Sequence, residues 1–265
     1  MSHTYIHHSV VNSFDVLLVS TMILASIYYI YAAHIVRHNK PWPLYRTIFW
    51  LMGILCLTSM VVGPLAHQAH DDFRVHMLGH LLLGMLAPLL LVLSAPMTLA
   101  LRTLHVQLAR RISSLLKSSS MRILINPLSS SFLNVGGICL LYTTNLYVVM
   151  QHNIIVHLIV HIHVFLAGYL YTLSIIYVDP TPHRTSFVYR AVWLIISIAG
   201  HGILSKYIFA HPPGNVPVAH AETAGILMYY GGDAIEMVII FILCYQWYKA
   251  SRPRTSYTIE PLLNS

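Results

Sequence analysis

Two pairs of histidines share one spacing in this chain of 265 residues: His76 with His80, and His157 with His161. Residues four apart lie on one face of an α-helix, one turn above the other. Each pair would direct two imidazoles the same way, and neutral imidazole is a ligand for copper, zinc, iron and nickel. Both pairs fall in apolar stretches, where ionisable groups usually mark a site or a pathway. The pattern favours a metal site shared by two helices over four histidines that each bond a neighbouring carbonyl.

Later apolar stretches place further polar side chains at a similar depth. At ~1.5 Å per helical residue, His80 lies about 10 Å and His201 about 13 Å below the outer ends of their stretches, and Asp233 lies at a similar depth in the last one. Glu236, one turn deeper, is either a ligand or a group that orients one, and one of the two carboxylates could instead neutralise Lys206. The expected metal ligands are His76, His80, His157, His161, His201 and Asp233.

The elements that must position these residues are membrane-spanning helices. Hydrophobic residues make up 57% of the chain and charged residues 9%, against about 25% charged residues in a soluble domain. A helix needs about 20 apolar residues to cross a bilayer. Seven stretches qualify, at approximately residues 14–34, 47–65, 73–95, 131–150, 154–178, 188–210 and 224–247. We expect an all-α integral membrane protein, a seven-transmembrane-helix bundle that forms a single domain over residues 1–265.

Lysine and arginine are distributed unevenly between the loops. Of the 15, all but Arg74 and Lys206 fall on one set of loops or on the C-terminal tail. Cytoplasmic loops carry the excess of these residues, so the N-terminus is expected outside and the C-terminus in the cytoplasm. The net charge of +7 then reflects topology, and binding to nucleic acid is not expected. Only four of the 18 histidines fall on the cytoplasmic side: His34, His38, His105 and His183.

The longest expected loop, residues 96–130, contains an amphipathic segment. Its pattern is typical of a helix that lies on the inner leaflet of the membrane. It fits equally well a connecting helix whose leucines pack under the bundle, and the sequence leaves both interpretations open. The residues that recur at helical spacing are Leu101, Leu104, Leu108, Ile112 and Leu115, with Arg102, Arg110 and Arg111 on other faces.

The three cysteines, Cys56, Cys139 and Cys244, lie singly in different apolar stretches. Without a C-x-x-C pair, the chain encodes neither a disulfide framework nor a thiolate copper site. The sequence also contains no nucleophile with a neighbouring base and no phosphate-binding loop. We therefore do not expect an enzyme.

Several of these residues belong to longer motifs. The motifs are His76-Met77-x-x-His80, Ala87-Pro88-Leu89-Leu90-Leu91, Ser94-Ala95-Pro96, His157 to Phe165-Leu166-x-Gly168-Tyr169, Asp179-Pro180, His201 and Gly231-Gly232-Asp233. Together they resemble the signature of one family, the polytopic CtaG family of cytochrome c oxidase assembly factors. The resemblance extends from the first span to Trp247, although Met228-Tyr229-Tyr230 replaces a tryptophan-containing stretch expected in the last span.

The resemblance implies a function that residue spacing alone does not give. The family is implicated in the maturation of haem–copper oxidases of the caa type, through a copper centre of subunit I. It implies a bacterial plasma membrane, copper as the metal, haem–copper oxidase subunit I as a partner and external copper chaperones as further partners. The leading hypothesis is a membrane metallochaperone that holds copper near the outer face of the bilayer.

Two other functions are compatible with the same residues. One is electron transfer through a haem ligated by His76 or His80 and by His157 or His161. A haem relay across the membrane would need ligands near both faces, and the inner half has none. The other is proton or cation transport along Asp233, Glu236 and the histidines, which would need polar groups that continue inward through largely apolar spans.

The charge distribution makes a direct prediction about topology. A reporter fused after Arg254 should be active only in the cytoplasm, and one fused at Ser2 only outside, because 13 of the 15 cations lie on one set of loops and the tail. Paired reporters that each work on one side of the membrane measure this. The opposite pattern would overturn the orientation and place the histidines towards the cytoplasm.

Overall fold

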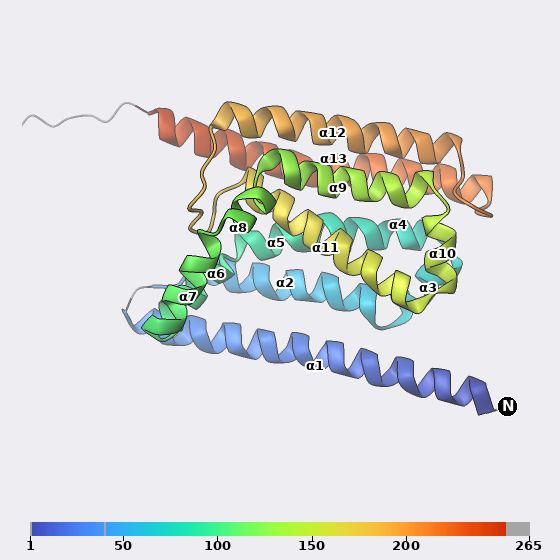
Figure 1. Cartoon of the computed structure of the whole chain (residues 1–265), viewed down its shortest axis with the longest axis horizontal. Helices are drawn as coiled ribbons and strands as arrows, with labels where there is room; N and C mark the ends of the chain where they lie inside the picture. Colours follow the sequence, from blue (N-terminus) through green and yellow to red (C-terminus); the bar gives the residue numbers. More distant parts are fainter. Residues whose placement is uncertain (1, 40, 253–265) are drawn as a thin grey trace, which may run out of the picture.

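The computed structural model describes residues 2–39 and 41–252, with side chains for residues 16–36 and 41–252. These residues form helices and no strands, which confirms the all-α class. Long helices run side by side, and short helices lie at the two ends of the bundle (Figure 1). One end, here called the histidine end, holds α3 (Pro64–Asp71) and α10 (Leu146–His152). The other, here called the basic end, holds α6 (Pro96–Thr103), α7 (Val106–Leu116) and α8 (Ser119–Leu124).

Six spans among the described residues are long and apolar enough to cross a membrane. Apolar helices in this number identify a membrane protein. Five are single helices and one is a run of three joined helical segments. The single helices are α1 (Ser2–Asn39), α2 (Leu44–Val61), α11 (Ile154–Ile175), α12 (Phe187–Ala210) and α13 (Val218–Ser251), and the run extends from Phe73 to Leu93.

The span expected at residues 131–150 is broken. α9 (Pro127–Thr143) and α10 meet at an angle of 79°, so seven spans are reached only if this bent pair counts as one. The hydroxyls of Thr143 and Thr144 donate to backbone carbonyls four residues earlier, a bond that competes with regular helix geometry and favours bends. The 17 residues of α9 rise about 26 Å. α10 then turns across the histidine end.

Two other expected boundaries move. α2 ends at Val61 rather than near residue 65, because Gly63 adopts a φ of 106° and Pro64 then begins α3. α13 begins at Val218, six residues before the expected start at 224, directly after Pro217. Proline fixes its own φ and is favoured where a helix begins, so Pro64 and Pro217 set the starts of α3 and α13.

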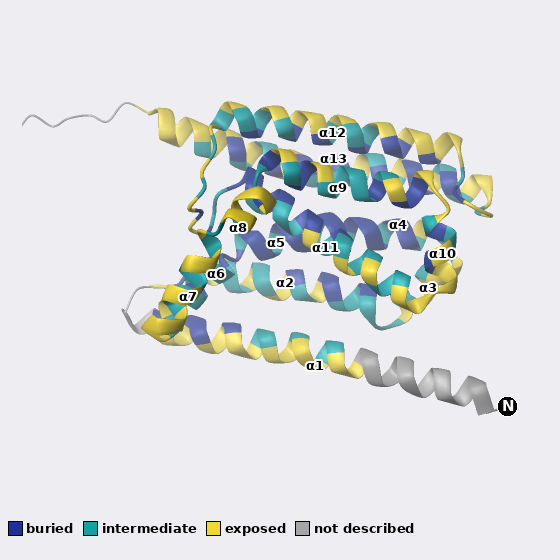
Figure 2. Cartoon of the chain, viewed as in Figure 1, coloured by how far each residue is buried: buried dark blue, intermediate teal, exposed yellow. Residues whose placement is uncertain are grey.

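The run from Phe73 to Leu93 is the central element of the bundle. It consists of α4 (Phe73–Leu81), the π-helical turn η1 (Leu82–Leu86) and α5 (Ala87–Leu93). In its most apolar stretch 67% of the residues are buried inside the protein, against 17–28% in the corresponding stretches of the other five spans. Figure 2 shows this burial along α4 and α5, while the described side chains of α1, those of residues 16–36, are largely exposed. The other helices expose apolar faces, which are surfaces for lipid. The run that carries His76 and His80 is surrounded by these helices.

A proline explains the π-helical turn. Pro88 has no N–H to donate to the carbonyl of Gly84, four residues earlier, and the N–H of Ala87 bonds to Leu82, five residues back. The carbonyl of Gly84 meets α11 at Gly168, where an added Cβ would overlap its oxygen. Such turns are common beside functional sites, and this one begins two residues after His80. The close approach of α11 to the central run therefore depends on a glycine.

A buried carboxylate joins two loops at the basic end. Asp179, 4% exposed, accepts hydrogen bonds from the backbone N–H groups of Met97 and Thr98 and from the Thr98 hydroxyl. The first N–H groups of a helix have no partner within it, so Asp179 caps α6. Ala95, just before that helix, adopts a φ of 52°. The Ser94-Ala95-Pro96 and Asp179-Pro180 motifs thus form a structural joint, away from the histidines.

Arg190, at the start of the span expected at residues 188–210, is buried inside α12 at the basic end. It is 2% exposed, and its guanidinium lies 4.1 Å from the ring centroid of Tyr177 and 4.3 Å from that of Phe187. Nη1 donates to the carbonyl of Ile175 at 2.8 Å. Aromatic faces and a carbonyl thus stabilise this cation.

The contact at Gly168 can be tested by substitution. Gly168→Ala should lower the free energy of unfolding by about 1–3 kcal/mol, because the new methyl group overlaps a backbone carbonyl that cannot move aside easily. The control is Gly136→Ala in α9, where the added Cβ makes only ordinary contacts of 3.9 Å or more. Unfolding of both variants in detergent measures the difference. Equal stability of the two would show that α11 does not depend on this approach.

Candidate metal centre

The two histidine pairs face each other between α4 and α11. The ring centroids of His76 and His161 lie 6.5 Å apart at an interplanar angle of 79°. His76 and His80 are 9% and 7% exposed, and His157 and His161 are half-buried. The structure thus brings together the two pairs that their spacing singles out.

These rings belong to a longer series of neighbouring imidazoles. At the exposed end, His70 of α3 stacks on His157 with ring centroids 4.9 Å apart, and His157 stacks on His161 at 4.1 Å. At the buried end, His80 stacks on His201 of α12 at 6.2 Å, and His201 is 4% exposed. We call this series the histidine ladder. Its members, from the exposed end to the buried end, are His70, His157, His161, His76, His80 and His201.

Hydrogen bonds orient one ring of the ladder and leave other ring nitrogens without a partner. Nδ1 of His161 donates to the carbonyl of His157 at 2.9 Å, since a carbonyl can only accept. The neutral ring then carries its lone pair on Nε2, the usual arrangement for a metal-binding histidine. Among the described residues, Nε2 of His80, Nε2 of His201 and Nδ1 of His157 have no hydrogen-bond partner. Imidazole nitrogens are therefore available for a ligand along the ladder.

Two tyrosines enclose His76. Its Nε2 lies 3.2 Å from the hydroxyl of Tyr142 in α9, and its ring packs edge-on against Tyr147 of α10 with centroids 5.2 Å apart. Both tyrosines are buried. The bend between α9 and α10 thus has a role at the site, because it directs one tyrosine from each helix at the same imidazole.

A small cavity lies between these rings. Its volume is about 30 Å³, and His76, His80, His161 and Tyr142 line it together with apolar side chains. That volume holds about one water molecule or ion. Met60 also lines the cavity, and a Cβ added at the neighbouring Gly79 would lie 2.7 Å from the Met60 sulfur.

A glycine of α13 makes room for the buried end of the ladder. A Cβ at Gly232 would overlap the imidazole of His201, which gives the Gly231-Gly232 motif a steric reason. Asp233, the next residue, lies about 100° around the helix from Gly232 and is half-buried; its place among the metal ligands stays a prediction. Glu236 is 3% exposed, and its Oε2 has no hydrogen-bond partner in the described part of the chain.

The side chains are arranged in pairs and not as a closed ligand set. Among the side chains that the structure describes, those of residues 16–36 and 41–252, no group of three or more His, Cys, Asp or Glu is placed to hold one metal ion. Structural metal sites usually take four ligands. The imidazoles of the ladder are a ligand type that binds transition metals, but they lie in neighbouring pairs that each offer two ligands.

Lys206 forms no ion pair with Asp233 or Glu236 in the part of the chain that the structure describes. The ion pairs among the described residues join Asp72 to Arg74 and to His220. The Lys206 ammonium instead lies 5.3 Å from the ring centroid of Tyr229. Asp233 and Glu236 are thus left without a cation from this lysine.

His163 turns away from the ladder, as its position on the helix predicts. Its Nε2 donates to the carbonyl of Leu133 in α9 at 3.2 Å. His70 and Tyr142, in contrast, are absent from the sequence-based set. His70 precedes its apolar stretch, and Tyr142 is one of 17 tyrosines with no distinguishing spacing. Attention to histidines just outside the spans could have found His70.

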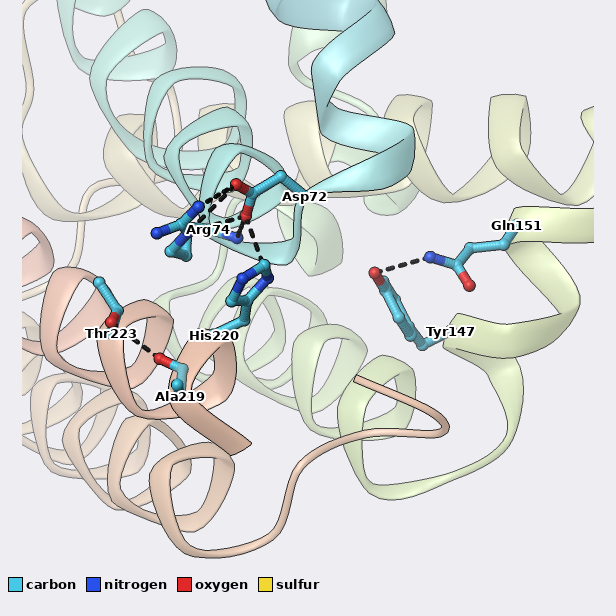
Figure 3. A network of polar contacts seen from close by, with 7 residues as sticks. All are labelled: Asp72, Arg74, Tyr147, Gln151, Ala219, His220 and Thr223. Atoms are coloured by element: carbon cyan, nitrogen blue, oxygen red, sulfur yellow. Dashed lines mark hydrogen bonds and ion pairs between the residues drawn. The ribbon is translucent and has the colours of Figure 1, made fainter. Parts of the chain in front are cut away.

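A polar network around Asp72 lies at the histidine end of the bundle (Figure 3). Asp72 accepts the backbone N–H of Arg74, which caps α4, and its carboxylate also binds the Arg74 guanidinium. Nδ1 of His220, in α13, lies 3.5 Å from the same carboxylate. The hydrogen bonds from Arg74 lower the pKa of Asp72 to about 2. The network connects the start of α4 to the start of α13.

Comparisons with known proteins bear on this arrangement. Residues 27–250 match the family described as cytochrome c oxidase caa3 assembly factor, Caa3_CtaG. An uncharacterized protein of Mycobacterium leprae is 32% identical over 185 residues, which cover 67% of this chain and 28% of that protein. One of Mycobacterium bovis is 32% identical over 158 residues, or 57% of this chain and 24% of that protein. The chain thus spans about a quarter of these relatives. No solved structure matches.

The charge on Asp72 should contribute to stability in a pH-dependent way. Asp72→Asn keeps a capping oxygen but removes the charge, and should lower the free energy of unfolding by up to about 1 kcal/mol near neutral pH. Because the folded pKa is depressed, the contribution is present above the unfolded value of about 3.9 and is lost as the pH falls through about 2. Denaturation at several pH values, with Asp71→Asn as control, measures it. A difference that persists unchanged at pH 2 would contradict the ion pair.

Proposed function

Because the chain belongs to the family of cytochrome c oxidase caa3 assembly factors, which gives it a role in oxidase assembly, we propose that it carries copper on the histidine ladder and passes it to subunit I of a haem–copper oxidase. One observation carries this proposal: neighbouring imidazoles extend from the exposed His70 to the buried His201. A cargo ion could move between such positions without leaving imidazole ligands.

The available donors support copper as the cargo. Imidazole binds copper well, and a thioether biases a site towards Cu(I); the Met60 side chain lines the same cavity as three histidines. The three cysteines are free and separate, so the ladder offers no competing thiolate pair. Paired ligands hold a metal less tightly than a complete four-ligand set, which suits a protein that must release its cargo.

The charge distribution supports a direction for delivery. The positive-inside rule places the basic end in the cytoplasm, and the histidine end then faces the outer side of a bacterial plasma membrane. His70 is the ladder's exposed member there, so external copper chaperones would load copper at His70. In this arrangement the protein binds and transfers a metal and needs no enzymatic step.

The size of the cavity disfavours a haem between the same histidines. A porphyrin must lie as a plate between its two axial ligands, whereas the space between His76, His80 and His161 is about 30 Å³. A haem would therefore require α4 and α11 to separate. The absorption spectrum of the purified protein distinguishes the two functions, since only a haem protein has a Soret band that disappears in His80→Ala.

The proposal predicts that copper content depends on the ladder and not on histidines in general. His161→Ala should lower copper affinity at least about tenfold, a loss typical of damage to a metal site. His163→Ala is the matched control, since it lies two residues away and bonds Leu133 instead. Bound copper per chain after equilibrium dialysis, together with oxidase copper content and activity in cells, measures both effects.

The coupling between two ladder substitutions provides a second test of whether the histidines bind one metal ion. If His80 and His161 act on one site, the double alanine variant should lose less binding free energy than the sum of the two single variants. All variants should insert and unfold like the parent, because alanine is well tolerated in spans. If folded His80→Ala and His161→Ala proteins keep full copper content and support oxidase assembly, the ladder is structural and the proposal is wrong.

A further inference from the structure

The basic end carries a surface that copper transport does not use. The segment between α5 and α9 contains five cations and no acidic residue. α6, α7 and α8 fold this segment across the end of the bundle, and α7 runs steeply across the direction of the long helices (Figure 1). The cations are Arg102, Arg110, Arg111, Lys117 and Arg122.

α7 is amphipathic, and part of its apolar side is not covered by protein. At about 100° per residue, Leu108 and Leu115 point in nearly the same direction, and they are 49% and 61% exposed. None of the residues of α7 is buried. Of the two interpretations that the sequence leaves open, packing of these leucines under the bundle is therefore wrong for both Leu108 and Leu115.

The two neighbouring arginines of α7 differ in their relation to this apolar side. Arg111 lies three residues after Leu108 and four before Leu115, so it flanks the exposed leucines. Arg110 lies about 140–160° away from them, on the opposite side of the helix. Both arginines are exposed. A cation at the edge of an apolar face is placed where lipid phosphates meet acyl chains.

We propose that α7 lies in the plane of the membrane and binds anionic phospholipids of the leaflet at the basic end. Leu108 and Leu115 insert at the level of the acyl chains, and Arg111 contacts the phosphates. The occupant follows from charge complementarity and from position, because α7 lies where the spans end and combines uncovered leucines with unopposed positive charge. This binding is separate from copper transport and holds even if the ladder carries no metal.

The test uses the full chain in nanodiscs of phosphatidylcholine, or of equal parts phosphatidylcholine and phosphatidylglycerol. Trace phospholipids with a photoactivatable acyl chain and either head group are cross-linked, and the adducts are mapped by mass spectrometry. We expect adducts at Leu108 and Leu115 and few at Ser114, which lies on the polar side. Phosphatidylglycerol should be preferred about two- to fivefold at low salt, and less at high salt.

Matched charge variants identify the cation responsible. Arg111→Gln should reduce the preference for phosphatidylglycerol at least about twofold, and Arg110→Gln, with the same change in charge, should reduce it less. Equal labelling by both lipids, or equal effects of the two variants, would overturn the proposal. The proposal would also be overturned if α7 formed no lipid adducts and purified oxidase protected α7 from labelling, because the surface would then bind protein.

Discussion

The contact between Gly84 and Gly168 sets the geometry on which the rest of the bundle depends. Pro88 cannot donate to the carbonyl of Gly84, so the central run widens at η1 and presents that carbonyl to α11. α11 can pack there only because Gly168 has no side chain. Towards the histidine end, the same approach brings His161 opposite His76. The π-helical turn in one helix and the glycine in its neighbour thus place the two histidine pairs opposite each other.

A ligand that binds the buried ring nitrogens of the ladder would stabilise the folded protein. A buried donor or acceptor without a partner costs about 1–3 kcal/mol, and His80 and His201 each have such a nitrogen among the described residues. A ligand that binds only the folded state stabilises it. Copper on these nitrogens would therefore remove a penalty that the apolar interior imposes. The buried carboxylate of Asp179 differs from these nitrogens, because it accepts three hydrogen bonds from Met97 and Thr98 and its role is structural.

The sequence predicts the parts of this structure that follow from periodicity. Spacing of four residues identifies two histidine pairs, and the structure brings His76 of one pair opposite His161 of the other. Apolar length predicts seven spans; six are confirmed among the described residues, and the seventh is the bent pair between Pro127 and His152. Contacts between segments that lie far apart in the sequence cannot be predicted from periodicity. The stacking of His70 on His157 and the fit of His201 against Gly232 depend on how helices pack, and no local pattern encodes either. The bend after Thr143 depends on hydroxyl bonds that compete with helix geometry, and the exposure of Leu115 depends on which helices cover it.

X-ray absorption at the copper edge tests the central claim most directly, because it reports the atoms bound to the metal in the intact protein. The full chain, purified in detergent and loaded with one equivalent of copper, should show nitrogen ligands with the multiple-scattering pattern of imidazole. A single sulfur at low occupancy would also be consistent, because Met60 lines the cavity. Copper bound only by oxygen, or by two or more sulfur atoms without imidazole, would contradict a metal carried on the histidine ladder.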